Sequence, residues 1–400
     1  MRLIACLTAC AVLSLLALPF PSPALAVEAD VKKELQKQKE IIENLGKRVE
    51  ELEDVNKAET ASQSEGGGMF PRFGHNLGAF GDINYLTDSR EKRNKSFSVG
   101  SLGLYVTGDN NDRLNFLIEM VVVSHNDRSS IDLERVWVGY AFDDLLTVRA
   151  GRFHTALGYW NREYHHGRHL FLSVDRPFFL KFEDTGGVIP VHIVGLELAG
   201  MKEFGGGRLK YVFEAGNGPG LMTDPHGSVP HNQGLTPRTL TDNNDEKQFV
   251  LRLVLDSVSV KGLSIGVSGT RYKAENYLKT ISVTETVYGL DAHYVKGGLD
   301  LLGEYFRFEN SREDADAYYA QAAYSIGRFT PYLRYERLSS NSVDPYLGRL
   351  TGGAARHQNI AGVRYEIDPA YSSLKAQFRR DIKKDGDDFD VFEFQWTFHF

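Results

Sequence analysis

Hydrophobic and polar side chains alternate along most of residues 70–400. In one run Leu114 and Phe116 share one face, whereas Asn115 and Glu119 share the other. A period of two is typical of a β-strand whose faces meet different surroundings, and helical periodicity is nearly absent from this region. The pattern therefore predicts an all-β body.

Sixteen such segments are separated by turn signals. They are expected at residues 75–86, 96–107, 113–123, 131–141, 145–153, 188–201, 208–215, 247–257, 261–272, 282–295, 299–309, 316–325, 328–338, 357–367, 372–381 and 390–400, although the segment near 299–308 alternates poorly. Short and long connections alternate between them, which is typical of a barrel with tight turns on one rim and long loops on the other. The pattern predicts a 16-stranded antiparallel transmembrane β-barrel at residues 70–400, closed because lipid cannot satisfy an open sheet edge.

The N-terminal segment has the pattern of a targeting signal. Arg2 precedes an apolar run at residues 3–18, and an A-x-A motif follows at residues 24–26. We interpret residues 1–26 as a signal peptide and expect cleavage before Val27. The alternative, a membrane anchor, is less favoured because the apolar run is short and ends at prolines.

Residues 27–60 have the pattern of one coiled-coil helix, and residues 61–69 that of a flexible linker. The apolar residues repeat in heptads, with Leu35, Ile42 and Val49 in the a positions and Val31, Leu45 and Leu52 in the d positions. Such a stripe needs a partner helix to bury it. Branched residues at a with leucine at d favour two strands, which conflicts with the trimer discussed below.

Composition excludes several classes of protein. The net charge of -7 gives no basic footprint, so we expect no nucleic acid as a partner. Both cysteines, Cys6 and Cys10, lie in the signal peptide, which leaves the mature chain without a thiolate metal site or a cysteine nucleophile. Outside that segment there is no long apolar run, which excludes a bundle of membrane helices.

The last strand carries an aromatic stripe. Phe392, Phe394, Trp396, Phe398 and Phe400 share one face, as expected for a lipid-facing strand that ends in an interface girdle. This strand resembles the C-terminal strand of bacterial outer-membrane porins. In those proteins a terminal phenylalanine helps recognition by the barrel-assembly machinery, so the resemblance implies that Phe400 is an assembly signal.

A second resemblance comes from the segments Arg-Val-Trp-Val-Gly-Tyr at 135–140, Leu-Thr-Val-Arg-Ala-Gly-Arg-Phe at 146–153 and Ala-Leu-Gly at 156–158. Together they resemble the phosphate-selective porin O/P superfamily, in which a Gly-Arg/Gln-Phe strand end leads into a long loop folded into the lumen. The resemblance implies a homotrimer in the bacterial outer membrane. The even number of strands leaves both ends of the barrel on the periplasmic side, which places the coiled coil in the periplasm. It also implies a water-filled channel for passive diffusion of small hydrophilic solutes and ions.

A barrel of sixteen strands encloses an aqueous lumen. Charged residues that alternate with outward apolar neighbours are expected to face it, because a charge facing lipid costs several kcal/mol. The expected pore-lining residues are Arg149, Arg252, Arg334, Glu336, Arg364, Glu366, Lys375 and Arg379. Four of them form what we call the cationic strip: Arg334, Arg364, Lys375 and Arg379. The strip would steer anions and give a mild anion preference, unless the interspersed acids pair with it. The resemblance implies that this preference is phosphate-like.

Residues 153–187 are the expected constriction loop by the same resemblance. Its charges balance, and its candidate site residues are Arg162, Glu163, His165, His166, Arg168, Asp175 and Arg176. The histidines at 165, 166 and 169 could bind a metal, but solvated loop histidines are more common, so we expect no metal site and no cofactor. Protonation below about pH 6.5 would add positive charge to the constriction.

Two other functions stay open. The barrel could be a sheath around an electron-transfer or export partner, or it could anchor an envelope tether whose coiled coil carries the function. No C-x-x-C-H motif is present, so any haem would belong to a partner. No short motif of a barrel protease or lipase is present either, and we expect no enzymatic activity.

Overall fold

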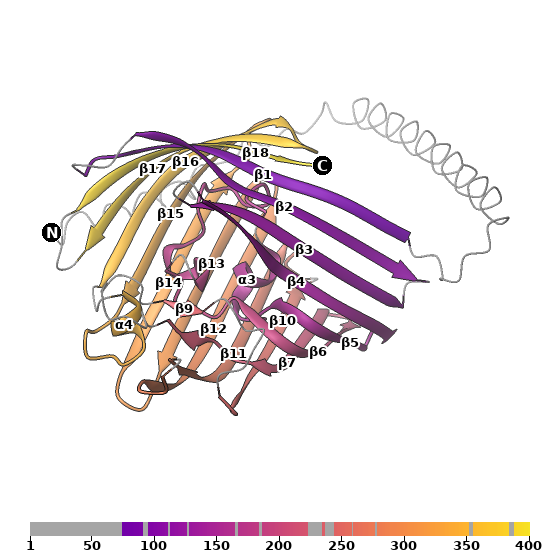
Figure 1. The fold of residues 1–400 in the computed structure, drawn as a ribbon. Helices are drawn as coiled ribbons and strands as arrows, with labels where there is room; N and C mark the ends of the chain where they lie inside the picture. The colour runs from indigo at the N-terminus through magenta and orange to yellow at the C-terminus, as the bar shows by residue number, and fades with distance from the viewer. Residues whose placement is uncertain are drawn as a thin grey trace, which may run out of the picture. The chain divides into compact units, whose positions relative to one another are not determined.

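Sixteen strands close into one antiparallel barrel in the computed structural model (Figure 1). The structure describes residues 74–400 apart from 91–94, 111–112, 126–127, 165–166, 184–185, 223–233, 237–243, 258, 277, 352–354 and 384–387. The predicted signal peptide, coiled coil and linker lie outside the described residues. The barrel lies within one compact unit of the chain, Arg72–Phe400.

The barrel strands follow one another around the wall in chain order. They are β1 (Gly74–Asp88), β2 (Ser96–Asn110), β3 (Leu114–His125), β4 (Arg128–Asp143), β5 (Leu146–His154), β6 (His192–Phe204), β7 (Gly207–Asn217), β10 (Lys247–Ser257), β11 (Leu263–Glu275), β12 (Ser282–Lys296), β13 (Leu299–Glu309), β14 (Asp314–Tyr324), β15 (Phe329–Ser339), β16 (Arg356–Asp368), β17 (Ser372–Lys383) and β18 (Phe389–His399). Each corresponds to one strand expected from the sequence. The largest difference is at β6, which begins at His192 rather than at residue 188. The prediction of a closed 16-stranded antiparallel barrel is confirmed.

A few short elements lie outside the wall. They are α3 (Gly158–Glu163), η2 (Phe178–Leu180), α4 (Leu347–Thr351) and a two-stranded sheet of β8 (Gly220–Leu221) and β9 (Leu235–Thr236). Within the described ranges, no helix has the length and apolar character needed to cross a membrane.

The barrel closes between its first and last strands. β1 pairs with β18 from Phe80 opposite His399 to Asp88 opposite Val391. Beyond that ladder, the amide of Phe400 donates to the Ala79 carbonyl at 2.8 Å, and the Ala79 amide donates to the Phe400 carbonyl at 3.1 Å. No edge of the wall between these strands is therefore left open.

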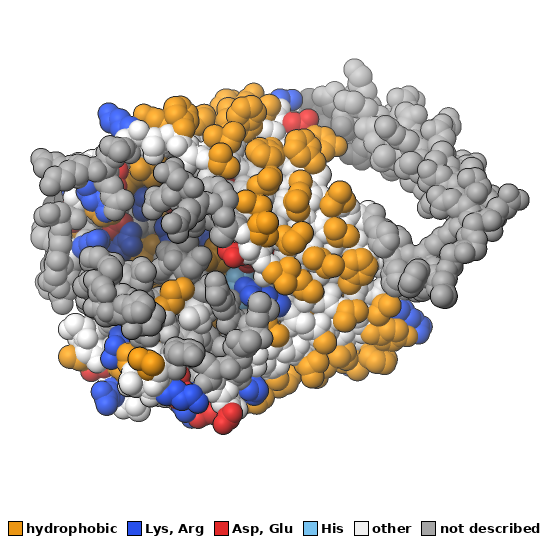
Figure 2. All heavy atoms as spheres, in the orientation of Figure 1, with side chains coloured by type: hydrophobic (Ala, Val, Ile, Leu, Met, Phe, Trp, Pro, Cys, Tyr) orange, Lys and Arg blue, Asp and Glu red, His pale blue; other side chains and the backbone are white. Residues whose placement is uncertain are grey.

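The two faces of the wall differ in polarity. On β15, the outward Leu333 is 63% exposed, whereas the inward Arg334 is 3% exposed. Figure 2 shows hydrophobic side chains over the outer wall, between rims that carry charged side chains. Because alternate residues of a strand point to opposite faces, one sequence pattern produces both an apolar exterior and a polar interior.

One rim consists of tight hairpins. β12 and β13 are joined through Gly297 and Gly298, whose φ angles are +60° and +85°. Positive φ at both central positions is the requirement of the tight turn that matches the twist of paired strands, and glycine meets it without strain. The opposite rim carries the long connections, including residues 155–191 between β5 and β6.

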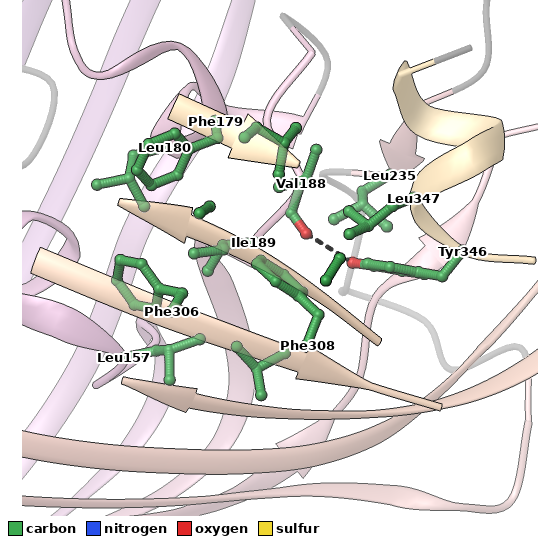
Figure 3. Packing of buried hydrophobic residues seen from close by; sticks show 14 of the residues in the cluster. Leu157, Phe179, Leu180, Val188, Ile189, Leu235, Phe306, Phe308, Tyr346 and Leu347 are labelled. Atoms are coloured by element: carbon green, nitrogen blue, oxygen red, sulfur yellow. Dashed lines mark hydrogen bonds between the residues drawn. The ribbon is translucent and has the colours of Figure 1, made fainter. Parts of the chain in front are cut away.

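Residues 155–191, which we call the inward loop, run into the barrel and pack against one side of the wall. Leu157, Phe179 and Ile189 of the inward loop belong to the same hydrophobic cluster as Phe306 and Phe308 of β13 (Figure 3). The cluster forms the core of the protein. On the side of β11–β15 these packed side chains therefore occupy part of the barrel interior.

Candidate functional site

The inward loop is anchored to the wall through its backbone. Arg334 Nη2 donates to the carbonyl oxygen of Asp175 at 2.9 Å, and Arg334 Nη1 also binds the Ser173 hydroxyl. The same guanidinium binds Glu336 through an Nε–Oε1 contact of 2.7 Å, and Glu336 in turn accepts a hydrogen bond from the Phe178 amide at 2.7 Å. Arg334 and Glu336 thus act as one ion pair that binds both a carbonyl and an amide of the loop.

Two further residues of the cationic strip contact the same loop. Arg364 Nη1 donates to the His169 carbonyl at 2.6 Å and pairs with Glu366 at 2.5 Å. Lys375 Nζ donates to the Ser173 carbonyl at 2.9 Å. The sequence predicted that these cations face the solution in the pore, but Lys375 is buried beneath the loop. Periodicity could not indicate this, because the loop that covers the strip is distant in sequence.

Among the described residues, Arg379 is the member of the strip that binds side chains and not the backbone of the loop. Its guanidinium lies 3.2 Å from Glu393 and 3.7 Å from Asp381. The Arg379 side chain is 11% exposed and that of Arg364 is 13% exposed. These two cations are therefore the members of the strip that stay partly exposed.

The other expected pore-lining arginines form cross-strand ion pairs. Arg149 of β5 pairs with Glu197 of β6, and Arg162 of the inward loop lies 2.6 Å from the same Glu197. Arg252 of β10 and Asp291 of β12 form a buried bidentate pair, with contacts of 2.5 and 2.9 Å. Each pair neutralises charge inside the wall, since a buried arginine without a carboxylate would be costly.

A second network lies between the loop and β1. Arg168 Nη1 is 3.1 Å from Asp175, and Arg168 Nε is 3.7 Å from Asp82 of β1. Burial raises the pKa of Asp175, but the charges of Lys181 and Arg168 outweigh it and hold that pKa well below its usual value. Asp175 is thus an ionised carboxylate that pairs with Arg168 within the loop.

The remaining loop candidates have different surroundings. Arg176 Nη2 donates to Asn161 Oδ1 at 2.9 Å, and the guanidinium lies 4.3 Å from the centroid of the Phe182 ring. Burial lowers the pKa of Arg176 to about 10. Glu163 is exposed at the end of α3. His165 and His166 lie outside the described residues.

Glu304 is a lumen residue that the sequence analysis missed. Its carboxylate accepts hydrogen bonds from the amides of Tyr159 at 2.7 Å and Trp160 at 3.0 Å, at the beginning of α3. The Tyr319 hydroxyl donates to the same carboxylate at 2.8 Å. A Cβ added to Gly158 would lie 2.2 Å from Glu304 Oε2, so glycine allows this close approach. The inward position of Glu304 was the available signal, but its strand alternates poorly.

The expected assembly residue lies at the closing seam. The ring of Phe400 is 70% exposed, and its centroid lies 5.9 Å from that of Phe398 and 6.5 Å from that of Tyr371. Its backbone is already paired with Ala79, as described above. The ring is therefore an outward aromatic feature that the barrel itself does not bury.

Comparisons with known proteins show the fold. No protein-family model matches the chain, and no curated protein matches it in sequence. Among solved structures, the anion-selective porin from Comamonas acidovorans has a TM-score of 0.58 and 13% identity, covering 82% of this chain and 100% of that chain. The outer membrane channel DcaP of Acinetobacter baumannii has a TM-score of 0.58 and 11% identity, covering 82% and 97%. OmpF of Salmonella typhi has a TM-score of 0.51 and 11% identity, covering 82% and 97%. The chain is therefore similar in fold to these barrels.

Proposed function

We propose that this chain is a porin, which forms a water-filled channel for passive diffusion of small hydrophilic solutes and ions. The observation that carries the proposal is a closed barrel with an apolar outer wall and a charged interior. An apolar exterior of this kind is suited to lipid, since charged side chains there would cost several kcal/mol each. The charged residues Arg149, Arg162 and Arg168 remain partly exposed inside.

The proposed location is the bacterial outer membrane, with residues 27–60 as a periplasmic coiled coil. The proposed assembly is a homotrimer inserted by the barrel-assembly machinery, which would recognise Phe400. Supporting these proposals are the fold shared with outer-membrane channels and the resemblance of residues 135–158 to the phosphate-selective porin O/P superfamily. Mass measurement in mild detergent tests the proposed trimer. A monomer would contradict it, and a dimer would instead agree with the two-stranded coiled coil that the heptad residues favour.

The proposed selectivity is a mild, phosphate-like preference for anions. Arg364 and Arg379 would carry it, because they keep partial access to the lumen. Each is paired with an acid, Glu366 and Glu393 respectively, which reduces the net field. Such pairing supports a partial preference for anions rather than complete exclusion of cations.

The packing of the inward loop bears on the sheath hypothesis. The cluster formed by Leu157, Phe179, Ile189 and the inner side of β13 occupies part of the lumen with this chain's own residues. That leaves less room for a partner protein inside the barrel, which favours the porin over a sheath. The tether hypothesis depends on residues 27–60 and stays an alternative.

Planar-bilayer recording tests the proposal. The purified, heat-modifiable barrel should insert in discrete conductance steps that increase with salt concentration. A preparation unfolded by boiling in detergent is the matched control and should give no steps. Folded barrels that insert but never conduct would contradict the porin and favour the sheath or the tether.

A further inference from the structure

Three side chains that could ligate a metal meet where the inward loop leaves the wall. Glu134, His154 and His192 each offer one ligand atom, and these atoms all lie within 4.8 Å of one another. Their exposed fractions are 4%, 3% and 2%. Buried groups of this kind are rare unless they are paired or bind an ion.

The register of three adjacent strands brings these residues together. His154 ends β5 and His192 begins β6, and the two are direct partners in the ladder. On β4, Arg135 pairs with Glu119 and Leu133 pairs with Met120, so Glu134 is the extra residue of a β-bulge. A bulge re-aims a side chain, and here it allows Glu134 to approach both histidines.

The second nitrogen of each imidazole is already engaged. His154 Nδ1 lies 3.2 Å from the Asn161 carbonyl oxygen, and His192 Nδ1 lies 3.1 Å from Glu183 Oε2. Carbonyl and carboxylate oxygens only accept, so each Nδ1 carries the proton and donates. In a neutral imidazole this leaves Nε2 with the lone pair, which is the arrangement of metal-binding histidines with outer carboxylate or carbonyl partners. His192 Nε2 lies 2.8 Å from Glu134 Oε2, which also only accepts, so without a metal this nitrogen donates to Glu134, and zinc would displace its proton.

We propose that Glu134, His154 and His192 bind a single zinc ion. Two imidazole nitrogens and one carboxylate oxygen form a zinc ligand set, with one position left for water. Tetrahedral zinc with bonds of about 2.0–2.1 Å holds its ligands about 3.3 Å apart, which requires only small movements here. His192 Nε2 and Glu134 Oε2 are 2.8 Å apart, and the ion would separate them slightly.

The ligands favour a metal that prefers nitrogen, and charges of both signs surround them. Glu134 and Glu183 supply negative charge, and Glu183 also accepts amide hydrogen bonds from Val191 and His192. Two cations oppose it: Arg152 Nε donates to the Glu134 carbonyl at 2.9 Å, and Arg176 lies against Phe182, whose ring stacks on His192. These arginines oppose any divalent cation, so the preference for zinc over magnesium comes from the two imidazole ligands.

The position of the site gives the ion a structural role. His154 and His192 directly precede and follow residues 155–191, so the ion would hold both ends of the inward loop to each other and to β4. The site does not depend on the proposed channel function. A loop held at both ends would keep its position in the lumen whatever the barrel transports.

Zinc binding by the folded barrel tests the proposal. Protein carrying a tag without histidine is stripped with a chelator, shown to remain heat-modifiable, and titrated with zinc alone. We expect one zinc per chain, a raised thermal unfolding midpoint, and X-ray absorption by a site with two imidazoles. His154→Gln should weaken binding at least tenfold, and Glu183→Gln should weaken it about 10- to 100-fold through loss of the outer partner.

A double variant, His165→Gln with His166→Gln, is the matched control and should bind zinc as the parent does. Loss of binding in that double variant would assign the ion to the loop histidines and overturn the proposal. Equal binding by the parent and by folded His154→Gln would also overturn it. So would absence of zinc binding together with a doubly protonated His192 in NMR spectra, which would identify a charge bridge from His192 to Glu134 and Glu183.

Discussion

Lys375 Nζ donates a hydrogen bond to the carbonyl oxygen of Ser173 at 2.9 Å, so a lysine of the wall holds the backbone of the inward loop. The same ammonium binds the Arg168 carbonyl at 2.5 Å and lies 4.7 Å from the centroid of the Phe171 ring. Lys375 thus contacts the loop at Arg168, Phe171 and Ser173. It was predicted to line the pore because of its charge, and in the structure it holds the loop in place.

Lys375→Met should loosen the loop, because it removes the donor and leaves buried carbonyl oxygens without this partner. The expected loss of unfolding free energy is about 1–3 kcal/mol. Single-channel recordings should show larger current fluctuations than in the parent. Lys202→Met, at an exposed position of β6, is the control and should change neither quantity. Parent-like noise and stability in Lys375→Met would contradict the anchoring role.

Neutralising Arg364 and Arg379 together, each to glutamine, should shift the reversal potential in a salt gradient toward cation preference. The shift should be largest at low salt and fade at high salt, because the Debye length is only about 8 Å at physiological ionic strength. An unchanged reversal potential at low salt would mean that Glu366 and Glu393 already cancel these charges. The channel would then be a general diffusion pore without anion preference.

Phe400→Ala should lower the yield of assembled barrel and leave aggregates in the periplasm. The substitution keeps the backbone pairing with Ala79 but removes the exposed ring at the interface. Semi-native gels measure the heat-modifiable fraction. Phe142→Ala removes another exposed aromatic ring of the wall and should assemble normally. Parent levels of assembled Phe400→Ala would remove the support for an assembly signal.

Gly158→Ala should destabilise the start of α3. Its φ of +78° is strained for alanine, and the new Cβ would lie 2.2 Å from Glu304 Oε2. The expected cost is about 1–3 kcal/mol, measured by denaturant unfolding. Gly205→Ala is the matched control, since a Cβ there would meet nothing within 4 Å. Equal stability of the two variants would show that α3 tolerates a shift away from Glu304.

Acidification should break the ion pair between Asp175 and Arg168, which joins two parts of the inward loop. The folded pKa of Asp175 is held below its ordinary value, so its contribution is fully present above about pH 3.9 and is lost as the pH falls through the folded value. Current fluctuations should therefore rise at low pH. Asp175→Asn should show raised fluctuations already at neutral pH, whereas Asp144→Asn on the short-turn rim should not. If Asp175→Asn left the pH dependence of the current fluctuations unchanged, the Asp175 carboxylate would not be the group responsible for it.

The strands of the wall could be predicted because apolar and polar residues alternate along each of them. This alternation is weakest at β13, and the structure gives the reason. Leu302, Phe306 and Phe308 face inward and are apolar because they receive the inward loop, so both faces of the strand are hydrophobic. Glu304 stands among them and was overlooked for that reason. The strand itself was predicted, but its packing against the inward loop could not be predicted from alternation.

The sequence predicted which side chains of the site point inward, but it could not predict their hydrogen-bond partners. Alternation indicates that Arg334 and Lys375 point inward, yet their partners are carbonyl oxygens of Asp175 and Ser173, which no side-chain pattern reveals. His154 and His192 are far apart in the chain and meet only because β5 and β6 pair in one register. Such contacts depend on the strand register and on the path of the loop. They are therefore set by the complete fold and cannot be predicted from local sequence patterns.

The hydroxyl of Tyr346, next to α4, donates to the Val188 carbonyl at 2.8 Å (Figure 3) and itself accepts from Tyr272 at 2.7 Å. Tyr346 belongs to the connection between β15 and β16 on the long-loop rim, whereas Val188 belongs to the inward loop. The connection on the rim and the inward loop are therefore joined through two buried hydroxyl groups. A movement of that connection would act on a carbonyl oxygen of the loop, so the position of the loop depends on the rim as well as on the wall.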